Sequence, residues 1–421
     1  MSAHAGLLLP LLLAAAAACA APGAEDALTF SGSAVGAEAD VIRRQLARFG
    51  ERYPGVRVEL RATPDAADQR RQLYVQWLNA RAPEPDVLQL DVIWTAEFAA
   101  AGWILPLELA DAGDFLPAAV AAARWRGTLY AAPWFVDLGL LYRRTDLAAD
   151  APRSLTDLRD AARRAVQTGA ARFGLVWQGA RYEGLVTVFL EHLGAFGGGI
   201  LDEDGRVIVD AAPAVQALTF MRDALGPDGF VPPSVLTWQE EQARFAFQNG
   251  DAAFMRNWPY AWSLLADARQ SRVAGRFAVA PFPPAAGGRP TAALGGAQLA
   301  VNAHTADPAR ALALVAFLTA PEQMLERARL AAQLPARQSL YDDPALTDAL
   351  PLPLDDIRAA MAAARPRPVT PVYSELSEIL QVRVHRALTG QEAPAAALAD
   401  AAAEMRTLLA RTGLAGADGS R

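Results

Sequence analysis

The chain has 421 residues, of which 52% are hydrophobic and 20% are charged, and its formal net charge is −7. A chain of this length exceeds one ordinary hydrophobic core, so we expect two lobes. The strongly basic side chains are all arginines, and no basic run is longer than two residues, which argues against nucleic acid as a partner.

The chain begins with an apolar run at residues 7–18, which ends at Cys19, the only cysteine. The run is too short to span a bilayer and is closed by small residues, as is typical of a secretory signal. We predict that residues 1–20 are a signal peptide and that Cys19 carries a lipid. Simple cleavage near Ala20 is the alternative, because Ala16 stands where a leucine is usual and no Lys or Arg precedes the run. Either way the protein is expected outside the cytoplasm, periplasmic or lipid-anchored to the outer face of the cell membrane, and the mature chain keeps no thiol for a disulfide.

Strands and helices are predicted to alternate after the leader. Apolar or alternating segments indicate strands at residues 28–30, 56–60, 86–92 and 173–177. Apolar side chains at helical spacing indicate helices around residues 42–49, 73–78, 185–193, 215–225 and 376–409. This alternation predicts an α/β fold with a parallel sheet covered by helices.

Two further apolar segments resemble crossings between lobes. One, at residues 133–141, is interrupted by Asp137, and the other, at 277–284, runs into a cluster of prolines. If both link the same pair of lobes, each lobe is discontinuous in sequence. The predicted N-terminal lobe then comprises residues 27–136 and 283–319, and the C-terminal lobe comprises 137–282 and 320–415.

Metal and cofactor chemistry have no visible site in the sequence. The four histidines are scattered without paired spacing: His4, His192, His304 and His385. Residues 202–205 could suggest a calcium loop, but the later ligands are missing, so a hairpin turn is the favoured interpretation. There is no nucleophile elbow, phosphate loop or dinucleotide fingerprint. We therefore expect no metal and no cofactor.

Aromatic residues recur beside isolated carboxylates: Asp91 with Trp94, Trp134 with Asp137, Trp177 with Tyr182 and Glu183, and Trp258 with Tyr260 and Trp262. Such pairs suit a sugar, whose C–H face can lie on an indole and whose hydroxyls donate to carboxylates. The alternative for any one tryptophan is a place in the core, and for any one aspartate a helix cap or turn. Asp91 and Asp137 are favoured as ligand contacts because each lies at a strand end or crossing, where open α/β sheets bind ligands.

Several segments, in their order and spacing, resemble extracellular solute-binding proteins of carbohydrate ABC importers, and in particular the trehalose/maltose-binding branch. They are DVIWTAEF at 91–98, AGWILPL at 101–107, LYAAPWFVD at 129–137, GLLY at 139–142, WQGARYEGL at 177–185, RNWPY at 256–260 and RPVTPVYSELS at 367–377. The resemblance covers essentially the whole mature chain.

The resemblance implies a two-lobed periplasmic-binding-protein fold with a hinge and an interlobe ligand cleft, and proteins of this class close about the hinge around their ligands. It implies a monomer that binds a di- or oligosaccharide without turnover and delivers it to a membrane permease. The cleft contacts it implies are Glu38, Thr63, Arg70, Asp91, Phe135, Asp137, Trp258, Tyr260 and Arg367, with Gly295 and Gly296 bringing backbone amides close to the ligand.

One departure and two other function classes stay open. Ala297 stands where the resembled branch commonly has a large aromatic after the paired glycines, which predicts a looser subsite or a differently linked sugar. A secreted glycoside-processing enzyme could use two of the carboxylates, such as Asp91 and Asp137, if they lie about 5 to 9.5 Å apart. A receptor for a polyamine or a metal chelate is the third possibility, against which the carbohydrate-branch motifs argue.

Overall fold

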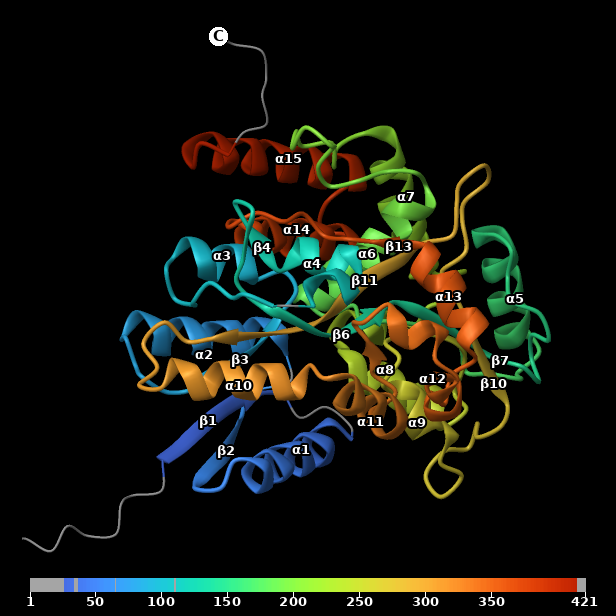
Figure 1. The fold of residues 1–421 in the computed structure, drawn as a ribbon. Coiled ribbons are helices and arrows are strands. Elements are labelled where there is room, and N and C mark those ends of the chain that lie inside the picture. The colour runs from blue at the N-terminus through green and yellow to red at the C-terminus, as the bar shows by residue number, and fades with distance from the viewer. Residues whose placement is uncertain (1–25, 34–36, 65, 110, 415–421) are drawn as a thin grey trace, which may run out of the picture.

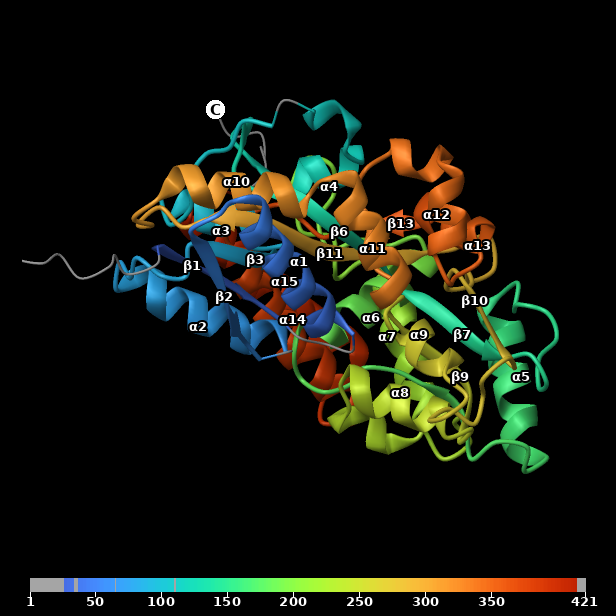
Figure 2. The ribbon, with the colours of Figure 1, turned by 60° about the horizontal axis from the view of Figure 1, so that its bottom comes forward.

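The computed structural model describes residues 26–33, 37–64, 66–109 and 111–414. The predicted signal peptide, residues 1–20, and Cys19 lie outside these residues. Figure 1 shows two bodies of strands and helices, with β1, β2 and β3 beside α1, α2 and α10 in one and with β7 and β10 beside α5 in the other. Figure 2 shows the same division after a rotation of 60°, with α8, α9 and β9 on the side of β7.

The larger sheet has seven strands in the order β12-β6-β11-β3-β1-β2, with β13 paired to β11. Its strands are β1 (Asp26–Gly32), β2 (Val56–Ala62), β3 (Val87–Asp91), β6 (Ala132–Leu138), β11 (Ala292–Val301), β12 (Leu334–Pro335) and β13 (Ala364–Arg365). β1 pairs in parallel with β2 and β3, as the alternation of elements predicts. β11 is antiparallel to both β3 and β6, so a strand from late in the chain completes the middle of the sheet.

The smaller sheet has four strands in the order β10-β7-β9-β8. They are β7 (Leu140–Arg144), β8 (Phe173–Val176), β9 (Ala252–Asn257) and β10 (Phe277–Ala280). The chain passes from the larger sheet to the smaller at Gly139, between β6 and β7, and returns between β10 and β11. A side chain at Gly139 would overlap the carboxylate of Glu191, so glycine permits the close approach at this crossing. The lobe boundaries given above stay a prediction, and β12 and β13, from the segment assigned to the second lobe, pair with strands of the larger sheet.

Helices cover both sheets, and a two-stranded hairpin, β4 (Arg124–Trp125) and β5 (Thr128–Leu129), lies apart from them. The helices of the first half are α1 (Glu38–Arg52), α2 (Ala67–Asn79), α3 (Thr95–Ala100), α4 (Pro117–Ala122), α5 (Leu155–Gln167), α6 (Glu183–Ala195) and α7 (Ala212–Ala224). Those of the second half are α8 (Glu240–Gln248), α9 (Ala261–Ala266), α10 (Pro308–Leu318), α11 (Pro321–Ala331), α12 (Pro344–Ala349), α13 (Leu354–Ala362), α14 (Tyr373–Leu388) and α15 (Pro394–Arg411). The predicted helical tail is therefore two helices, because Gly390 takes a φ of 77° and Pro394 begins the second.

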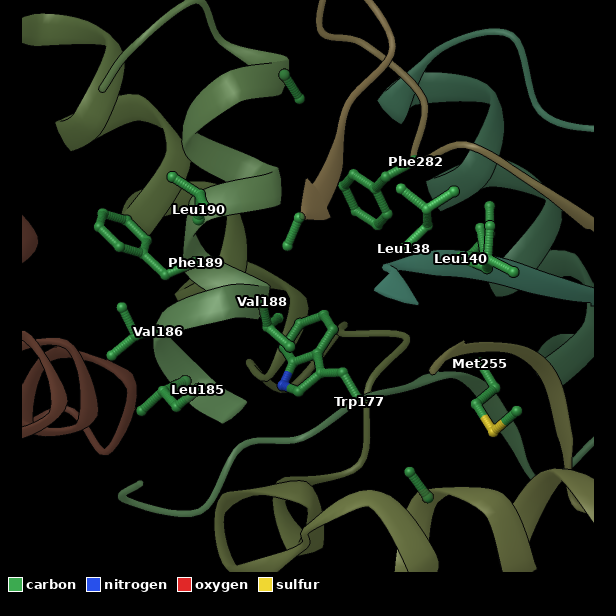
Figure 3. Close-up of a cluster of buried hydrophobic side chains, with 14 of the residues drawn as sticks. Leu138, Leu140, Trp177, Leu185, Val186, Val188, Phe189, Leu190, Met255 and Phe282 are labelled. Carbon is green, nitrogen blue, oxygen red and sulfur yellow. The ribbon is translucent and has the colours of Figure 1, made fainter. Parts of the chain in front are cut away.

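The buried apolar side chains form two clusters, one for each body. One surrounds β1, β3 and α1 and contains Phe30, Ile42, Trp94 and Trp134. The other surrounds β7, β9 and α6, and Figure 3 shows Trp177 and Val188 within it. Three tryptophans are almost fully buried: Trp94, Trp134 and Trp177 are 1%, 1% and 0% exposed. They therefore belong to the core and cannot stack against a sugar.

The segment at residues 202–205 is a hairpin turn, as favoured above. Leu201 and Val207 form an antiparallel bridge, and the Asp202 carboxylate accepts the backbone N–H groups of Asp204 and Arg206 at 3.0 and 2.8 Å. Asp202 also forms an ion pair with Arg206. Its oxygens are thus used within the turn, and no group of three or more potential metal ligands occurs among the described residues.

Candidate functional site

A cavity of about 350 Å³ lies between the two bodies, where strand ends and helix starts from both sheets meet. Its walls include ten of the predicted contact residues: Glu38, Arg70, Asp91, Phe135, Asp137, Trp258, Tyr260, Gly295, Gly296 and Arg367. Thr63 is the exception; its backbone N–H donates to Gly32 at 3.0 Å at the end of the β1–β2 pair, and it is not part of the wall. The volume is that of an ordinary small-ligand site. The contacts of these residues with a ligand stay a prediction.

Glu38, the first residue of α1, is buried and held by four side-chain donors. Its Oε2 accepts the Ser33 hydroxyl at 2.7 Å, and its Oε1 accepts Arg327 Nη2 at 3.1 Å. Gln333 and Gln89 donate to the same Oε1 at 3.2 and 3.3 Å. Burial lowers the pKa of Arg327 to about 10, although Glu38 opposes that shift. The Glu38 carboxylate therefore has a fixed orientation and a paired charge.

Arg367 joins the two bodies through two carboxylates, of which Glu183 is buried and Asp91 is partly buried. Its Nη2 donates to Asp91 Oδ1, at the end of β3, at 3.1 Å, and its Nη1 donates to Glu183 Oε1, at the start of α6, at 2.8 Å. Tyr373 donates to Glu183 Oε1 at 2.8 Å, and Ser377 donates to Glu183 Oε2. Arg367 was expected to reach the ligand; it lines the cavity, but both of its terminal nitrogens are already committed to carboxylates. This cluster spans the cavity and fixes Asp91.

Asp137 stands near the end of β6, opposite Gly295 of β11. Burial, together with the charges of Glu38 and Asp91, raises the pKa of Asp137 to about 7. Arg256 is nearby, but its Nε and Nη2 donate to Glu191 at 2.9 and 2.6 Å. Asp137 has no ion pair within the part of the chain that the structure describes, so its carboxylate is open to a ligand.

Two aromatic side chains that follow β9 form part of the opposite wall. Trp258 is anchored by its backbone, because Tyr142 donates to its carbonyl at 2.7 Å and its N–H donates to the Asn257 side chain at 2.9 Å. The Arg256 guanidinium lies 3.9 Å from the centre of the Trp258 ring. The Tyr260 hydroxyl donates to Glu241 at 2.7 Å. Both rings are thus held rigidly at the cavity.

The glycine pair on β11 brings backbone to the cavity wall. Gly296 has a φ of 121°, and a Cβ at this position would overlap the carbonyl oxygen of Phe135. A Cβ on Gly295 would lie 3.2 Å from the Trp258 ring. Ala297 pairs with Asp91 on one side and with Phe135 on the other, and it also lines the cavity. A small residue there leaves space that a large aromatic would fill.

Arg70 reaches the cavity from α2 and is 7% exposed. Its Nη1 donates to the Pro64 carbonyl at 3.2 Å, and its guanidinium lies 5.2 Å from the centre of the Trp94 ring. The guanidinium that forms an ion pair with Asp91 is that of Arg367.

Further wall residues were not predicted: Gln89, Tyr182, Glu183, Glu240, Glu241 and Gln333. Tyr182 and Glu183 belong to the aromatic–carboxylate pairs noted in the sequence, and that signal could have added them. Glu240 and Glu241 begin α8, where acidic residues are common because they favour the helix dipole. The sequence alone does not distinguish an acidic residue that stabilises the helix start from one that lines the cavity.

The protein resembles known proteins along most of its length. Residues 35–325 match the family model described as bacterial extracellular solute-binding protein. A probable ABC transporter-binding protein of Deinococcus radiodurans is 36% identical over 394 residues, which are 88% of this chain and 91% of that protein. The solved structure of maltose-bound MalE3 of Thermotoga maritima is 42% identical with a TM-score of 0.86, covering 91% of this chain and all of that one.

The fold agrees with a more distant structure as well. The GacH receptor of Streptomyces glaucescens matches with a TM-score of 0.83 at 24% identity, over 92% of this chain and 99% of that one. The two-lobed α/β fold predicted from the sequence is thereby confirmed. No helix in the described ranges is both long enough and apolar enough to cross a membrane. The family and these relatives are binding proteins rather than enzymes, which excludes the glycoside-processing alternative. The chain therefore belongs to the family of bacterial extracellular solute-binding proteins.

Proposed function

We infer that the protein is the substrate-binding component of a carbohydrate ABC importer, which binds a di- or oligosaccharide of the trehalose/maltose kind and delivers it to the membrane permease. The names of two relatives support this inference, since one is a probable ABC transporter-binding protein and the other was solved with maltose. The family supports a location outside the cytoplasm. A lipid anchor at Cys19 and a monomeric state belong to the same proposal.

The observation that carries the proposal is the placement of both Asp137 and Trp258 next to Gly295 in one cavity. A carboxylate without an ion pair can accept sugar hydroxyls, while a rigid indole can cover a C–H face of the ring. Glu38 and Asp91, whose orientations are fixed by arginine, add acceptors on the side of the larger sheet. Rigid donors and acceptors reduce the ordering cost of binding.

The experiment is calorimetric titration of the protein with trehalose, maltose and other disaccharides. We expect one of them to bind with a dissociation constant of about 1 μM or tighter, which is about −8 kcal/mol. At pH 8, where Asp137 is ionised, replacing it with asparagine should weaken that binding about 10- to 100-fold, because a hydrogen bond to a charged acceptor is lost. The matched control is Asp223→Asn, which changes an exposed aspartate on α7. Failure of the whole panel to bind would refute the proposal.

Turnover is tested with the same samples. Prolonged incubation with each disaccharide should release no monosaccharide, since a binding protein returns its ligand unaltered. Ala297, which lines the cavity with only a methyl group, makes trehalose one candidate among several. Ala297→Phe should therefore lower the affinity for the preferred sugar, if that sugar occupies the space beside β11.

A further inference from the structure

The charges on the cavity wall do not balance. Among the described residues, six carboxylates but only two guanidinium groups line it: Glu38, Asp91, Asp137, Glu183, Glu240 and Glu241 against Arg70 and Arg367. Arg327 and Arg244 neutralise Glu38 and Glu241 from behind the wall. Arg367 is shared between two carboxylates. Asp137, with its pKa of about 7, is only partly ionised near neutral pH, but the five other carboxylates still outnumber the four guanidinium groups, so the cavity carries more negative than positive charge.

Two of these carboxylates, Asp137 and Glu240, form no ion pair within the described ranges of the chain. The two guanidinium groups whose charge reaches Asp137 are Arg256 and Arg327. Arg256 makes a buried, double contact with Glu191, and Arg327 is bound to Glu38. Neither can turn toward Asp137 without leaving another buried carboxylate unpaired, which is strongly unfavourable.

Glu240, the second of these carboxylates, lies near the indole nitrogen of Trp258. The indole N–H of Trp258 donates to the Glu240 carboxylate only at the long distance of 3.5 Å. The Tyr182 hydroxyl lies in the same region of the wall, where burial and the charge of Glu240 raise the pKa of Tyr182 well above its ordinary value. Tyr182 is 6% exposed, and its hydroxyl faces the Glu240 carboxylate. Two neutral donors, Trp258 and Tyr182, thus face the Glu240 carboxylate, and neither neutralises its charge, which indicates a place for a cationic ligand donor.

A neutral sugar can satisfy the hydrogen-bonding groups of this wall but not its negative charge. A hydroxyl can donate a hydrogen bond to a carboxylate, but it leaves the negative charge in place. A protonated amine donates hydrogen bonds and also neutralises the charge, in a site where water screens little. The Tyr260 ring adds a further preference for a cation, since aromatic faces attract positive charge, whereas the Trp258 ring already has the Arg256 guanidinium against it.

We propose that the cavity prefers a sugar that carries a protonated amine to the same sugar with a hydroxyl at that position, with Asp137 and Glu240 as the carboxylates that recognise the cation. This inference rests on the proposed function, because the ligand is still a sugar. The ligand class is thus an amino-deoxy di- or oligosaccharide.

The test compares neutral, charged and re-neutralised forms of one sugar. Trehalose and maltose are titrated into the protein at pH 7, together with forms in which an amine replaces the hydroxyl at C2, C4 or C6 of one ring. The N-acetyl derivative of each amine is the chemical control, since it keeps the nitrogen but has no charge. At least one amine should bind about tenfold more tightly than its parent, whereas its N-acetyl derivative should not, because a hydrogen bond between two charged groups is stronger than one to a neutral donor.

Two variants test whether Asp137 and Glu240 cause the preference for an amine. Glu240→Gln and Asp137→Asn keep the shape of each side chain, and each should reduce the ratio of amine to parent affinity toward one. Glu203→Gln, at the exposed hairpin turn, is the matched control and should keep the ratio. Because two variants are used, the assignment is still tested if one of them fails to fold.

The outcomes separate this inference from the proposed function. If the parent disaccharides bind and every amine binds equally or more weakly, the amine preference is overturned and the proposed function stands. If neither the parent disaccharides nor their amino derivatives bind, the amine preference and the proposed function are both refuted. A preference that survives in both carboxylate variants would overturn the assignment to Asp137 and Glu240. A plain diamine, putrescine, that binds as tightly as the amino sugars would show that the site recognises a polyamine instead.

Discussion

Asp137→Asn should remove a specific pH dependence from the stability of the protein. Burial holds the pKa of Asp137 at about 7 in the folded chain, against an ordinary value of 3.8. Between these two values the folded protein keeps a proton that the unfolded chain has released. The folded state binds more protons there, so its stability falls as the pH rises from about 4 to about 7 and then levels off.

The magnitude follows from the size of the pKa difference. Each pH unit within that window lowers the free energy of unfolding by about 1.4 kcal/mol, so the change from pH 5 to pH 8 is about 2 to 3 kcal/mol. Asparagine is neutral throughout and does not contribute this slope. We therefore expect the variant to match the wild type near pH 5 and to exceed it in stability by about 2 to 3 kcal/mol at pH 8.

Urea unfolding of both proteins, in the absence of sugar, at pH 5, 6, 7 and 8 measures this difference. Titration of all other groups is common to the two proteins and largely cancels in the comparison. Asp223→Asn is the matched control, because its carboxylate is 64% exposed and should give a difference that does not change with pH. Parallel stability curves for Asp137→Asn and the wild type would refute the assignment of a raised pKa to this buried carboxyl.

Three other substitutions test the cavity wall. Arg367→Met removes the cation that the buried Glu183 shares with the partly buried Asp91, and it should cost about 3 to 5 kcal/mol in urea unfolding because the Glu183 charge loses its partner. Arg43→Met, from an ion pair that is 60% and 78% exposed, should cost less than about 1 kcal/mol. Gly296→Ala should cost at least about 1 to 3 kcal/mol, because its φ of 121° and a β6 carbonyl oppose any Cβ, while Gly113→Ala, with open space around it, should be near neutral. Trp258→Ala should lower the affinity for the preferred disaccharide by about tenfold in calorimetry, and unchanged affinity would return this ring to a purely structural role.

The sequence was a good guide to elements whose signal is local. The parallel β1, β2 and β3 and the helices between them follow from apolar periodicity, which depends only on neighbouring residues. The crossings at residues 133–141 and 277–284 were visible because an apolar strand interrupted by a carboxylate, or ended by prolines, is unusual. The tail predicted to be helical consists of two helices, α14 and α15, which a turn at Gly390 separates.

The cavity wall was predicted in large part, but the partners of its residues were not. Glu183, Arg367 and Asp91 are far apart in the chain, and no local pattern reveals that one guanidinium bridges two carboxylates. The same limit applies to Trp94 and Trp134, whose placement beside carboxylates in the sequence suggested a sugar platform although both are buried. Which face a side chain presents is set by the sheet that forms around it.

Some features of this protein depend on neighbouring residues in the sequence, and others depend on contacts between distant segments. Periodicity is enough to predict an α/β fold, and the sequence motifs resemble those of solute-binding proteins of carbohydrate importers. The charge of the cavity depends instead on how β11 enters between β3 and β6 and on where Arg256, Arg327 and Arg367 find their partners. Those pairings arise only when distant segments fold together, and they leave Asp137 and Glu240 open to a ligand.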